Sequence, residues 1–237
     1  MANDIVPELL DQIKKEFNQE YKSNIKIKAL LKKLETEKLD YDDAYNYAEE
    51  VGKILVKTLK NNINSETLPE GKMYYNIAKR IMDDTLINNH ELVADYSQIV
   101  QTAINNQAGY NIKGLKSELN YDRIDGFIQR LASEENFEDI DWILGDPVMT
   151  FTRVTVDNTV EINAEYNHKL GIEAVIERTE RYDACPWCKS LEGVYNYPDD
   201  VPDEVYMRHD NCRGRVIYKP ADKWKVQNVH DKEWYWR

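Results

Sequence analysis

The sequence predicts an α+β protein with a mostly α-helical body followed by a small, zinc-ribbon-like β module in its C-terminal part. Apolar residues recur at helical spacing through roughly the first 140 residues, and a long uninterrupted segment then runs to Gly171. Beyond Gly171 lie four of the seven prolines and all three cysteines, and 172–178 is typical of a strand. We therefore expect a helical body over 1–145, a connecting helix over 146–171 and a zinc-binding β module with an aromatic tail over 172–237.

The helical body is predicted from apolar stripes, which mark the buried faces of amphipathic helices. The stripes lie in 5–17, 27–34, 44–59, 74–81, 92–103 and 124–131. Asp40 stands where an N-cap residue is expected before the third stripe. Pro69 and Gly71 predict a loop over 61–72, and the stripes at 74–81 and 92–103 are interpreted as two separate helices.

The connecting helix has recognisable ends. Asp146 is a candidate N-cap, and Pro147 follows at the first helical position, where its missing N–H costs nothing. Gly171 stands where a left-handed C-terminal stop is favoured. The β-branched residues within 154–160 lower helix propensity, but no turn residue interrupts the segment, so a helix is favoured.

Composition limits the classes of function. The net charge is −12, and an acidic chain is a poor general binder of nucleic acid because phosphate affinity depends on Lys and Arg. No apolar run reaches about 18 residues, so we expect no membrane span. The first residues lack the pattern of a secretory signal, which favours a cytosolic protein or one assembled in the cytosol. Clustered cysteines in such a compartment indicate metal ligands or redox groups.

Two short motifs predict a metal site. They are Cys185-Pro-Trp-Cys188 and, 20 residues later, His209-Asp-Asn-Cys212. Two residues between the members of each pair let a tight turn direct both side chains at one ion, as in closed tetrahedral zinc sites. Three thiolates and one imidazole suit zinc. A closed ligand set leaves no position for a reactive water, so we expect no enzyme activity at this zinc.

Other interpretations of these residues are weaker. A redox dithiol of Cys185 and Cys188 would leave His209 and Cys212 without a role, and its usual βαβ context is missing. An HNH-type nuclease needs a second histidine as general base, for which His168 and His230 are the candidates. The acidic stretch 199–204 lacks the glycine and distal glutamate of a regular calcium loop and is interpreted as a solvated turn.

Two further features are candidate contact surfaces. A run of basic residues is a possible site for DNA or a protein partner, although a solvated hairpin face is the simpler interpretation. Its members are Arg208, Arg213, Arg215, Lys219, Lys223 and Lys225. Near the end of the sequence, Trp234, Tyr235 and Trp236 suggest an aromatic segment that docks either onto this chain or onto a partner.

The stretch 171–218 resembles the C-terminal part of minor head (minor capsid) proteins of tailed phages, related to the phage Mu F-like head-morphogenesis class. The resemblance rests on residue types in one order, from the first cysteine pair to the last strand. That order is Cys185-Pro-Trp-Cys188, Leu191-Glu-Gly193-Val-Tyr195-Asn-Tyr197, Val201-Pro202-Asp-Glu-Val205-Tyr206, Arg208-His209-Asp-Asn-Cys212-Arg213 and Val216-Ile-Tyr218. It covers a quarter to a third of the chain. Where members of the family often have Cys-Arg-Cys, this chain has Cys212-Arg213-Gly214.

The resemblance implies a low-copy, non-enzymatic virion component, located in the head interior or at the portal vertex and assembled in the host cytoplasm. Its implied partners are the phage portal and/or the major capsid protein, with packaged DNA as a further contact and a role in DNA ejection. The alternative function is a zinc-dependent nucleic-acid-binding module or a degenerate HNH-type nuclease that uses the basic run.

Overall fold

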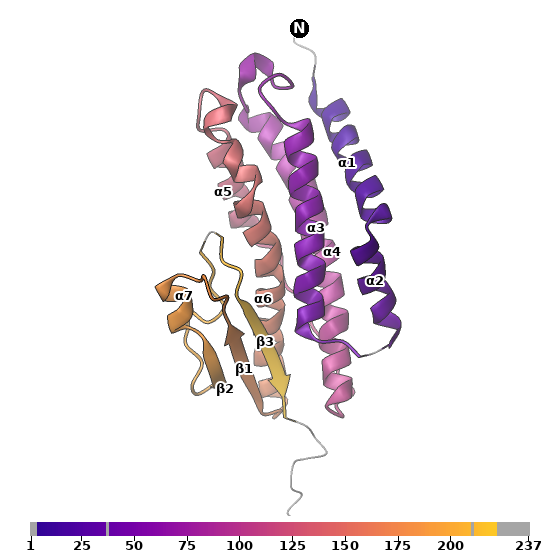
Figure 1. The fold of residues 1–237 in the computed structure, drawn as a ribbon, viewed down its shortest axis with the longest axis vertical. Coiled ribbons are helices and arrows are strands. Elements are labelled where there is room, and N and C mark those ends of the chain that lie inside the picture. Colours follow the sequence, from indigo (N-terminus) through magenta and orange to yellow (C-terminus); the bar gives the residue numbers. More distant parts are fainter. Residues whose placement is uncertain (1–3, 37, 210, 222–237) are drawn as a thin grey trace, which may run out of the picture.

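The structure, a computed structural model, describes residues 4–36, 38–209 and 211–221. Within them the protein is a mixed α+β fold in which a long helical bundle carries a small antiparallel sheet on one side (Figure 1). The helices are α1 (Val6–Ser23), α2 (Ile25–Lys33), α3 (Tyr41–Asn62), α4 (Tyr75–Gln107), α5 (Tyr121–Leu131), α6 (Asp146–Lys169) and the short α7 (Pro186–Ser190). Single 3₁₀ turns are η1 (Leu34–Thr36), η2 (Pro69–Gly71), η3 (Phe137–Asp139) and η4 (Asp141–Leu144).

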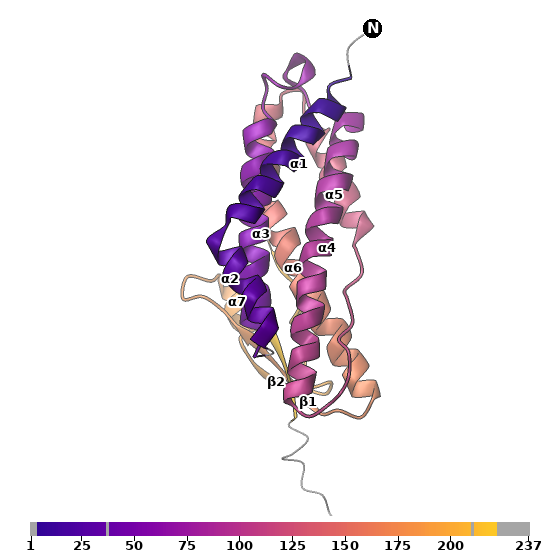
Figure 2. The ribbon, with the colours of Figure 1, turned by 90° about the vertical axis from the view of Figure 1, so that its right-hand side faces the viewer.

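Helices α3, α4 and α6 pack against one another and form the centre of the bundle. Helices α1 and α2 cover α3 on the side away from the sheet, and α5 lies along α4 (Figures 1 and 2). The apolar stripes predicted much of the buried faces, since Ile13, Val51 and Ile128 are all at most 1% exposed. Leu31 and Ile99, which were predicted to belong to these faces, are exposed. In the described part of the chain, no helix is both long enough and apolar enough to cross a membrane.

The start of α3 confirms the predicted cap. The Asp40 side chain accepts a hydrogen bond from the Asp43 N–H at 3.1 Å, and the Asp43 side chain accepts one from the Asp40 N–H. This reciprocal capping box satisfies backbone donors that a helix start leaves without partners.

The prediction of two helices over 74–81 and 92–103 was wrong, because both segments belong to the single helix α4. No glycine or proline occurs between Tyr75 and Gln107 to end it. The apolar stripe is interrupted in the middle by Thr85, Asn89 and His90, which are buried although they are polar. The buried face of α4 is therefore continuous, although polar residues interrupt its apolar stripe.

Helix α6 was correctly predicted as a helix, but Asp146 is not its N-cap. Asp146 is the first helical residue, and Gly145 occupies the N-cap position without a side-chain hydrogen bond. Gly171 has a φ of 79°, the left-handed conformation expected after the helix. The β-branched threonines are accommodated because their hydroxyls bond carbonyls one turn back, as from Thr159 to Thr155 O at 2.9 Å.

The helix predicted as a connector packs against both α3 and α4 along its length, so it is a central member of the bundle. Its face toward α4 is unusually polar. Asn167 Nδ2, for example, donates to Asn105 Oδ1 and to the Tyr218 hydroxyl, both at 3.0 Å. These bonds connect α6 to α4 and to the sheet.

The sheet has three antiparallel strands in the order β2-β1-β3, namely β1 (Ala174–Thr179), β2 (Gly193–Tyr197) and β3 (Arg215–Pro220). Strand β3 lies against α3 and α6. Ile176, Val216 and Tyr218 belong to the same hydrophobic cluster as the helices. The β module therefore shares the core of the bundle, which sets the position of the predicted metal ligands.

Candidate metal centre

The first pair of predicted ligands lies at the start of α7. Cys185 is the N-cap residue, and the Cys188 N–H donates to Cys185 Sγ at 3.4 Å. Pro186 fills the first helical position, where its fixed φ suits the turn. The Cys-Pro-Trp-Cys segment is thus one helical turn that directs both sulfurs to the same side.

The second pair lies in the loop between β2 and β3. The Cys212 N–H donates to the His209 carbonyl at 3.2 Å, which closes a turn. Asn211 has a φ of 65° within that turn, a conformation that asparagine tolerates better than most residues. Val205, which is 0% exposed, anchors the loop in the core.

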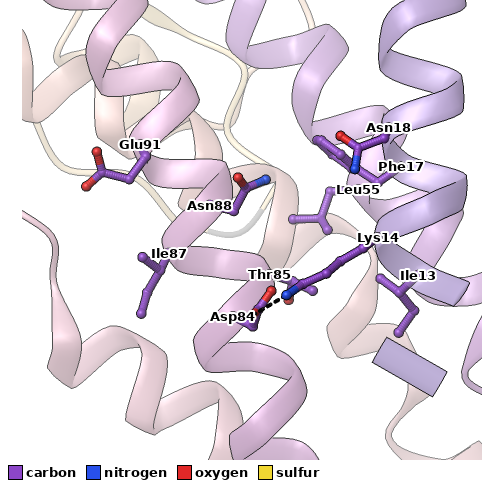
Figure 3. A pocket seen from close by; sticks show the side chains of 10 residues that line it. All are labelled: Ile13, Lys14, Phe17, Asn18, Leu55, Asp84, Thr85, Ile87, Asn88 and Glu91. Atoms are coloured by element: carbon purple, nitrogen blue, oxygen red, sulfur yellow. Dashed lines mark hydrogen bonds and ion pairs between the residues drawn. The ribbon is translucent and has the colours of Figure 1, made fainter. Parts of the chain in front are cut away.

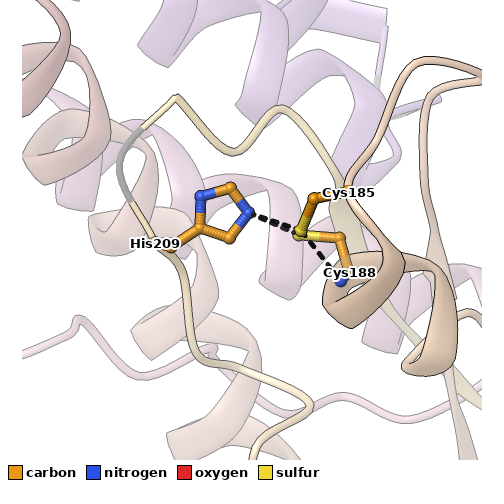
Figure 4. A group of neighbouring side chains, drawn as sticks. All are labelled: Cys185, Cys188 and His209. Atoms are coloured by element: carbon orange, nitrogen blue, oxygen red, sulfur yellow. Dashed lines mark hydrogen bonds between the residues drawn. The ribbon is translucent and has the colours of Figure 1, made fainter.

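The two turns face each other, and their side chains meet (Figure 4). His209 Nε2 lies 3.2 Å from Cys185 Sγ and 3.0 Å from Cys188 Sγ. Cys212 Sγ lies 3.6 Å from Cys188 Sγ. Neighbouring ligand atoms of a tetrahedral zinc site with Cys and His are separated by about 3.6–3.8 Å, given the usual bond lengths. Cys185, Cys188 and His209 form one group whose ligand atoms lie close enough to hold a metal ion, and Cys188 and Cys212 form a second such group with Glu180. Cys188 is common to both groups.

The cluster is buried on one side and open on the other. Cys188 and Cys212 are 1% and 3% exposed, whereas Cys185 is half-buried and His209 is exposed. A cleft of about 410 Å³, lined by all four residues, leads to the open side. An ion can therefore enter past His209 and Cys185, while the two buried sulfurs are held by the protein.

The thiols differ in acidity. Burial and the neighbouring Cys212 raise the pKa of Cys188 to about 12, whereas the Cys188 backbone N–H lowers the pKa of Cys185. A dication bound among the sulfurs would favour the thiolate form of both, because metal coordination deprotonates a thiol.

Two arginines with buried side chains lie close to the sulfurs of Cys188 and Cys212. The guanidinium of Arg178, on β1, lies 3.9 Å from both Cys188 Sγ and Cys212 Sγ. It also donates to the carbonyls of Val205 at 2.6 Å and Met207 at 3.0 Å, which holds the loop leading to the second ligand pair. Arg208 lies 3.8 Å from Cys212 Sγ.

Glu180 and Gly214 complete the surroundings, and neither was predicted as part of the site. Glu180 has a side chain 1% exposed, pairs with Arg178 at 2.8 Å, and groups with Cys188 and Cys212 as a potential ligand set. A Cβ atom at Gly214 would overlap the Glu180 carboxylate. A residue with a Cβ atom at position 214 would therefore force the Glu180 carboxylate to move.

The basic run predicted as a contact surface is largely engaged within the molecule. Arg208 was wrongly predicted as a surface contact: its side chain is 2% exposed and is paired with Asp157 of α6. Arg215 pairs with Asp42, and Lys219 pairs with Glu177. Arg213 is exposed. The remaining predicted contacts, Lys223, Lys225, Trp234, Tyr235 and Trp236, lie outside the described residues.

The rival sites gain no support from the geometry. His168 lies on α6 with its ring 5.6 Å from that of Tyr197, and within residues 4–36, 38–209 and 211–221 it belongs to no potential metal group. The acidic residues of 199–204, all of which the structure describes, belong to no potential metal group either. His230, the other candidate base, falls outside the part of the chain that the structure describes.

A separate hollow lies between α1 and α4 (Figure 3). Ile13, Phe17 and Leu55 line its apolar part, and an ion pair between Lys14 and Asp84 of 2.7 Å spans it. No potential metal group from the described part of the chain includes a residue of this hollow, so it is unconnected with the cysteine cluster.

Comparisons of the chain with protein-family models, with curated proteins and with solved structures gave no match. The cluster and the sequence motif that contains it are therefore the features of the chain that bear on its function.

We predict that Gly214→Ala destabilises the protein by about 1–3 kcal/mol, because the added methyl displaces the buried Glu180 carboxylate and thereby Arg178. The matched control is Gly126→Ala on α5, where an added Cβ meets nothing within 4 Å. That substitution should be neutral or stabilise by up to about 1 kcal/mol. Urea unfolding of both variants measures the difference. Equal free energies of unfolding for Gly214→Ala and the unsubstituted protein would contradict the packing described at Gly214.

Proposed function

We propose that the protein is a non-enzymatic minor structural protein of a tailed-phage head, with a structural zinc ion bound by Cys185, Cys188, His209 and Cys212. The observation that carries the proposal is the coincidence of two facts. The residues that resemble the minor head proteins follow one order along the chain, and the four possible metal ligands among them belong to two adjoining groups of potential ligands that share Cys188. Spacing and spatial proximity are independent observations, and both point to the same four residues.

Zinc is the metal that this donor set favours. Three sulfurs and one imidazole nitrogen are soft to borderline ligands, and a set of four is typical of closed structural zinc sites. With all four positions occupied by the protein, zinc-activated water has no place, so the role of the ion is to hold the loop and α7 together. In small modules such binding contributes on the order of 10 kcal/mol to folding.

The partners that we propose are the portal and/or the major capsid protein, within the head interior or at the portal vertex. Tyr182 and Trp187 flank the ligand Cys185 and are 87% and 39% exposed. Aromatic side chains of this kind are enriched where protein surfaces meet. The metal would hold these aromatic groups in place for such a contact.

The nucleic-acid alternative is less well supported. A DNA-binding surface needs basic side chains that are available to phosphates. In this chain Arg208 is buried, and Arg215 and Lys219 are occupied by acidic partners. DNA binding is therefore the alternative that the experiment on phage particles below tests against the proposed structural role.

We predict about one zinc ion per chain in freshly purified, reduced protein, measured by inductively coupled plasma mass spectrometry. Cys188→Ser should lower the zinc content severalfold and loosen 172–220, while the helical circular dichroism signal is largely retained, because the helices supply most of the residues of the shared core. Ser190→Ala, an exposed change at the end of the same helix, is the control and should keep full zinc content. A zinc content near zero in the unsubstituted protein would eliminate the metal site.

We predict that the protein is found in purified phage particles and co-purifies with the portal protein encoded by the same phage. Mass spectrometry of gradient-purified particles and affinity purification from cells that express both proteins are the measurements. Absence from particles, together with salt-sensitive DNA binding that Arg213→Ala abolishes, would reject the proposal in favour of the nucleic-acid alternative.

A further inference from the structure

We infer that Asp157 and Arg208 are positioning residues of the metal centre, which connect the ligand Cys212 to helix α6. This inference rests on the metal site of the proposed function and goes beyond it. It assigns a role in metal binding to a residue of the helical bundle that contacts no metal ligand itself.

The geometry is a continuous chain of contacts. The Arg208 guanidinium donates through Nε and Nη2 to both carboxylate oxygens of Asp157, with Nη2 2.8 Å from Oδ1. Its remaining nitrogen, Nη1, lies 3.4 Å from the Cys212 carbonyl oxygen and 3.8 Å from Cys212 Sγ. The two charged side chains are 2% and 0% exposed, so water does not screen this arrangement.

Asp157 is itself held in place by α3. The Tyr45 hydroxyl donates to Asp157 Oδ1 at 2.6 Å and accepts a hydrogen bond from the Val216 N–H at 2.9 Å. The ring of Tyr45 also lies under the guanidinium, with the Arg208 Cζ atom 5.5 Å from its centroid. Residues from α3, α6 and the metal-binding loop therefore converge on one guanidinium group.

The charges explain why an arginine is suited to this position. Its planar group can bind a carboxylate with two nitrogens and still present a third to another acceptor. Here the second acceptor is a cysteine sulfur, which is a thiolate when it binds a metal. Arg208 would stabilise that negative charge, while Asp157 prevents the arginine from being an unpaired buried cation.

The consequence is reciprocal coupling between metal binding and the docking of the β module on the bundle. When a residue that orients a metal ligand is replaced, the metal affinity of the site commonly changes. By thermodynamic linkage, metal binding must then strengthen the docking of the loop on α6 to the same degree. Arg178 also contacts the sulfurs, but it holds several loop carbonyls, so its replacement would not separate positioning from folding.

The test is the affinity for Co²⁺ and Zn²⁺ of the full chain, measured by competition with a chromophoric chelator. We expect Asp157→Asn, which keeps the shape of the side chain and removes its charge, to weaken binding about 10- to 100-fold. We also expect it to shift the thiolate-to-cobalt charge-transfer band, which a change in fold stability alone would not move.

The matched control is Asp42→Asn. It breaks the exposed ion pair between Arg215 and α3 at the same interface but touches no predicted ligand. Its affinity should stay within about twofold of that of the unsubstituted protein, as expected for an exposed pair. If Asp157→Asn does not fold, Tyr45→Phe replaces it, because this variant keeps both charges and removes the hydroxyl that donates to Asp157 and accepts from the Val216 N–H. We expect its affinity to fall by about 2- to 10-fold, in line with the loss of the hydrogen bond to Asp157.

The outcomes separate the two proposals. If the unsubstituted protein binds neither metal, the metal site and the proposed function fail together. If it binds metal but Asp157→Asn, or Tyr45→Phe in its place, shows unchanged affinity and an unchanged cobalt spectrum, the positioning role is overturned and the metal site stands.

Discussion

The buried ion pair between Asp157 and Arg208 is the interaction on which the arrangement of this protein depends. A charged pair without solvent is costly unless each group is fully satisfied, and removal of one partner typically costs 3–5 kcal/mol. Here the carboxylate is bonded by Arg208 and Tyr45, and the guanidinium has an acceptor for each of its nitrogens. The pair therefore fixes the loop that carries His209 and Cys212 relative to α3 and α6 in one orientation.

The rest of the β module follows from this anchor. A three-stranded sheet of five- and six-residue strands is too small to bury a core of its own, and Ile176, Val216 and Tyr218 bury their side chains against the helices instead. The loop that carries His209 and Cys212 buries Val205, whereas its Val201 and Tyr206 are only partly buried against the core. Arginine contacts to its carbonyls and a metal among its ligands would supply the order that packing cannot. The module is thus held by the bundle on one side and by the cluster on the other.

Much of this could be predicted from the sequence, and the reasons are local. Each pair of cluster residues follows from its spacing, because a two-residue gap in a turn places the two side chains together, whereas the meeting of the two pairs depends on the fold. The cap at Asp40 and the left-handed Gly171 are likewise properties of a few neighbouring residues. The α+β class follows from the change in residue pattern after Gly171.

What could not be predicted depends on contacts between distant segments. Arg208 looked like part of a basic surface because nothing near it in the sequence shows that Asp157, 51 residues earlier, lies beside it. The continuity of α4 was missed because Asn89 and His90 are polar and yet buried. The close contact between Glu180 and Gly214 arises because the end of β1 and the end of the loop lie side by side, which the sequence does not show. Burial of a polar residue is a tertiary property, and no local signal in the sequence reports it.

The most direct test of the account is hydrogen exchange of the backbone amides, measured by mass spectrometry before and after removal of the metal with a chelator. After removal of the metal we expect faster exchange in the loop, in α7 and in β3, together with faster exchange in the part of α6 around Asp157, because Arg208 joins the loop to α6 there. Faster exchange confined to 185–212, with α6 unchanged, would contradict the claim that the cluster and the helices form one unit.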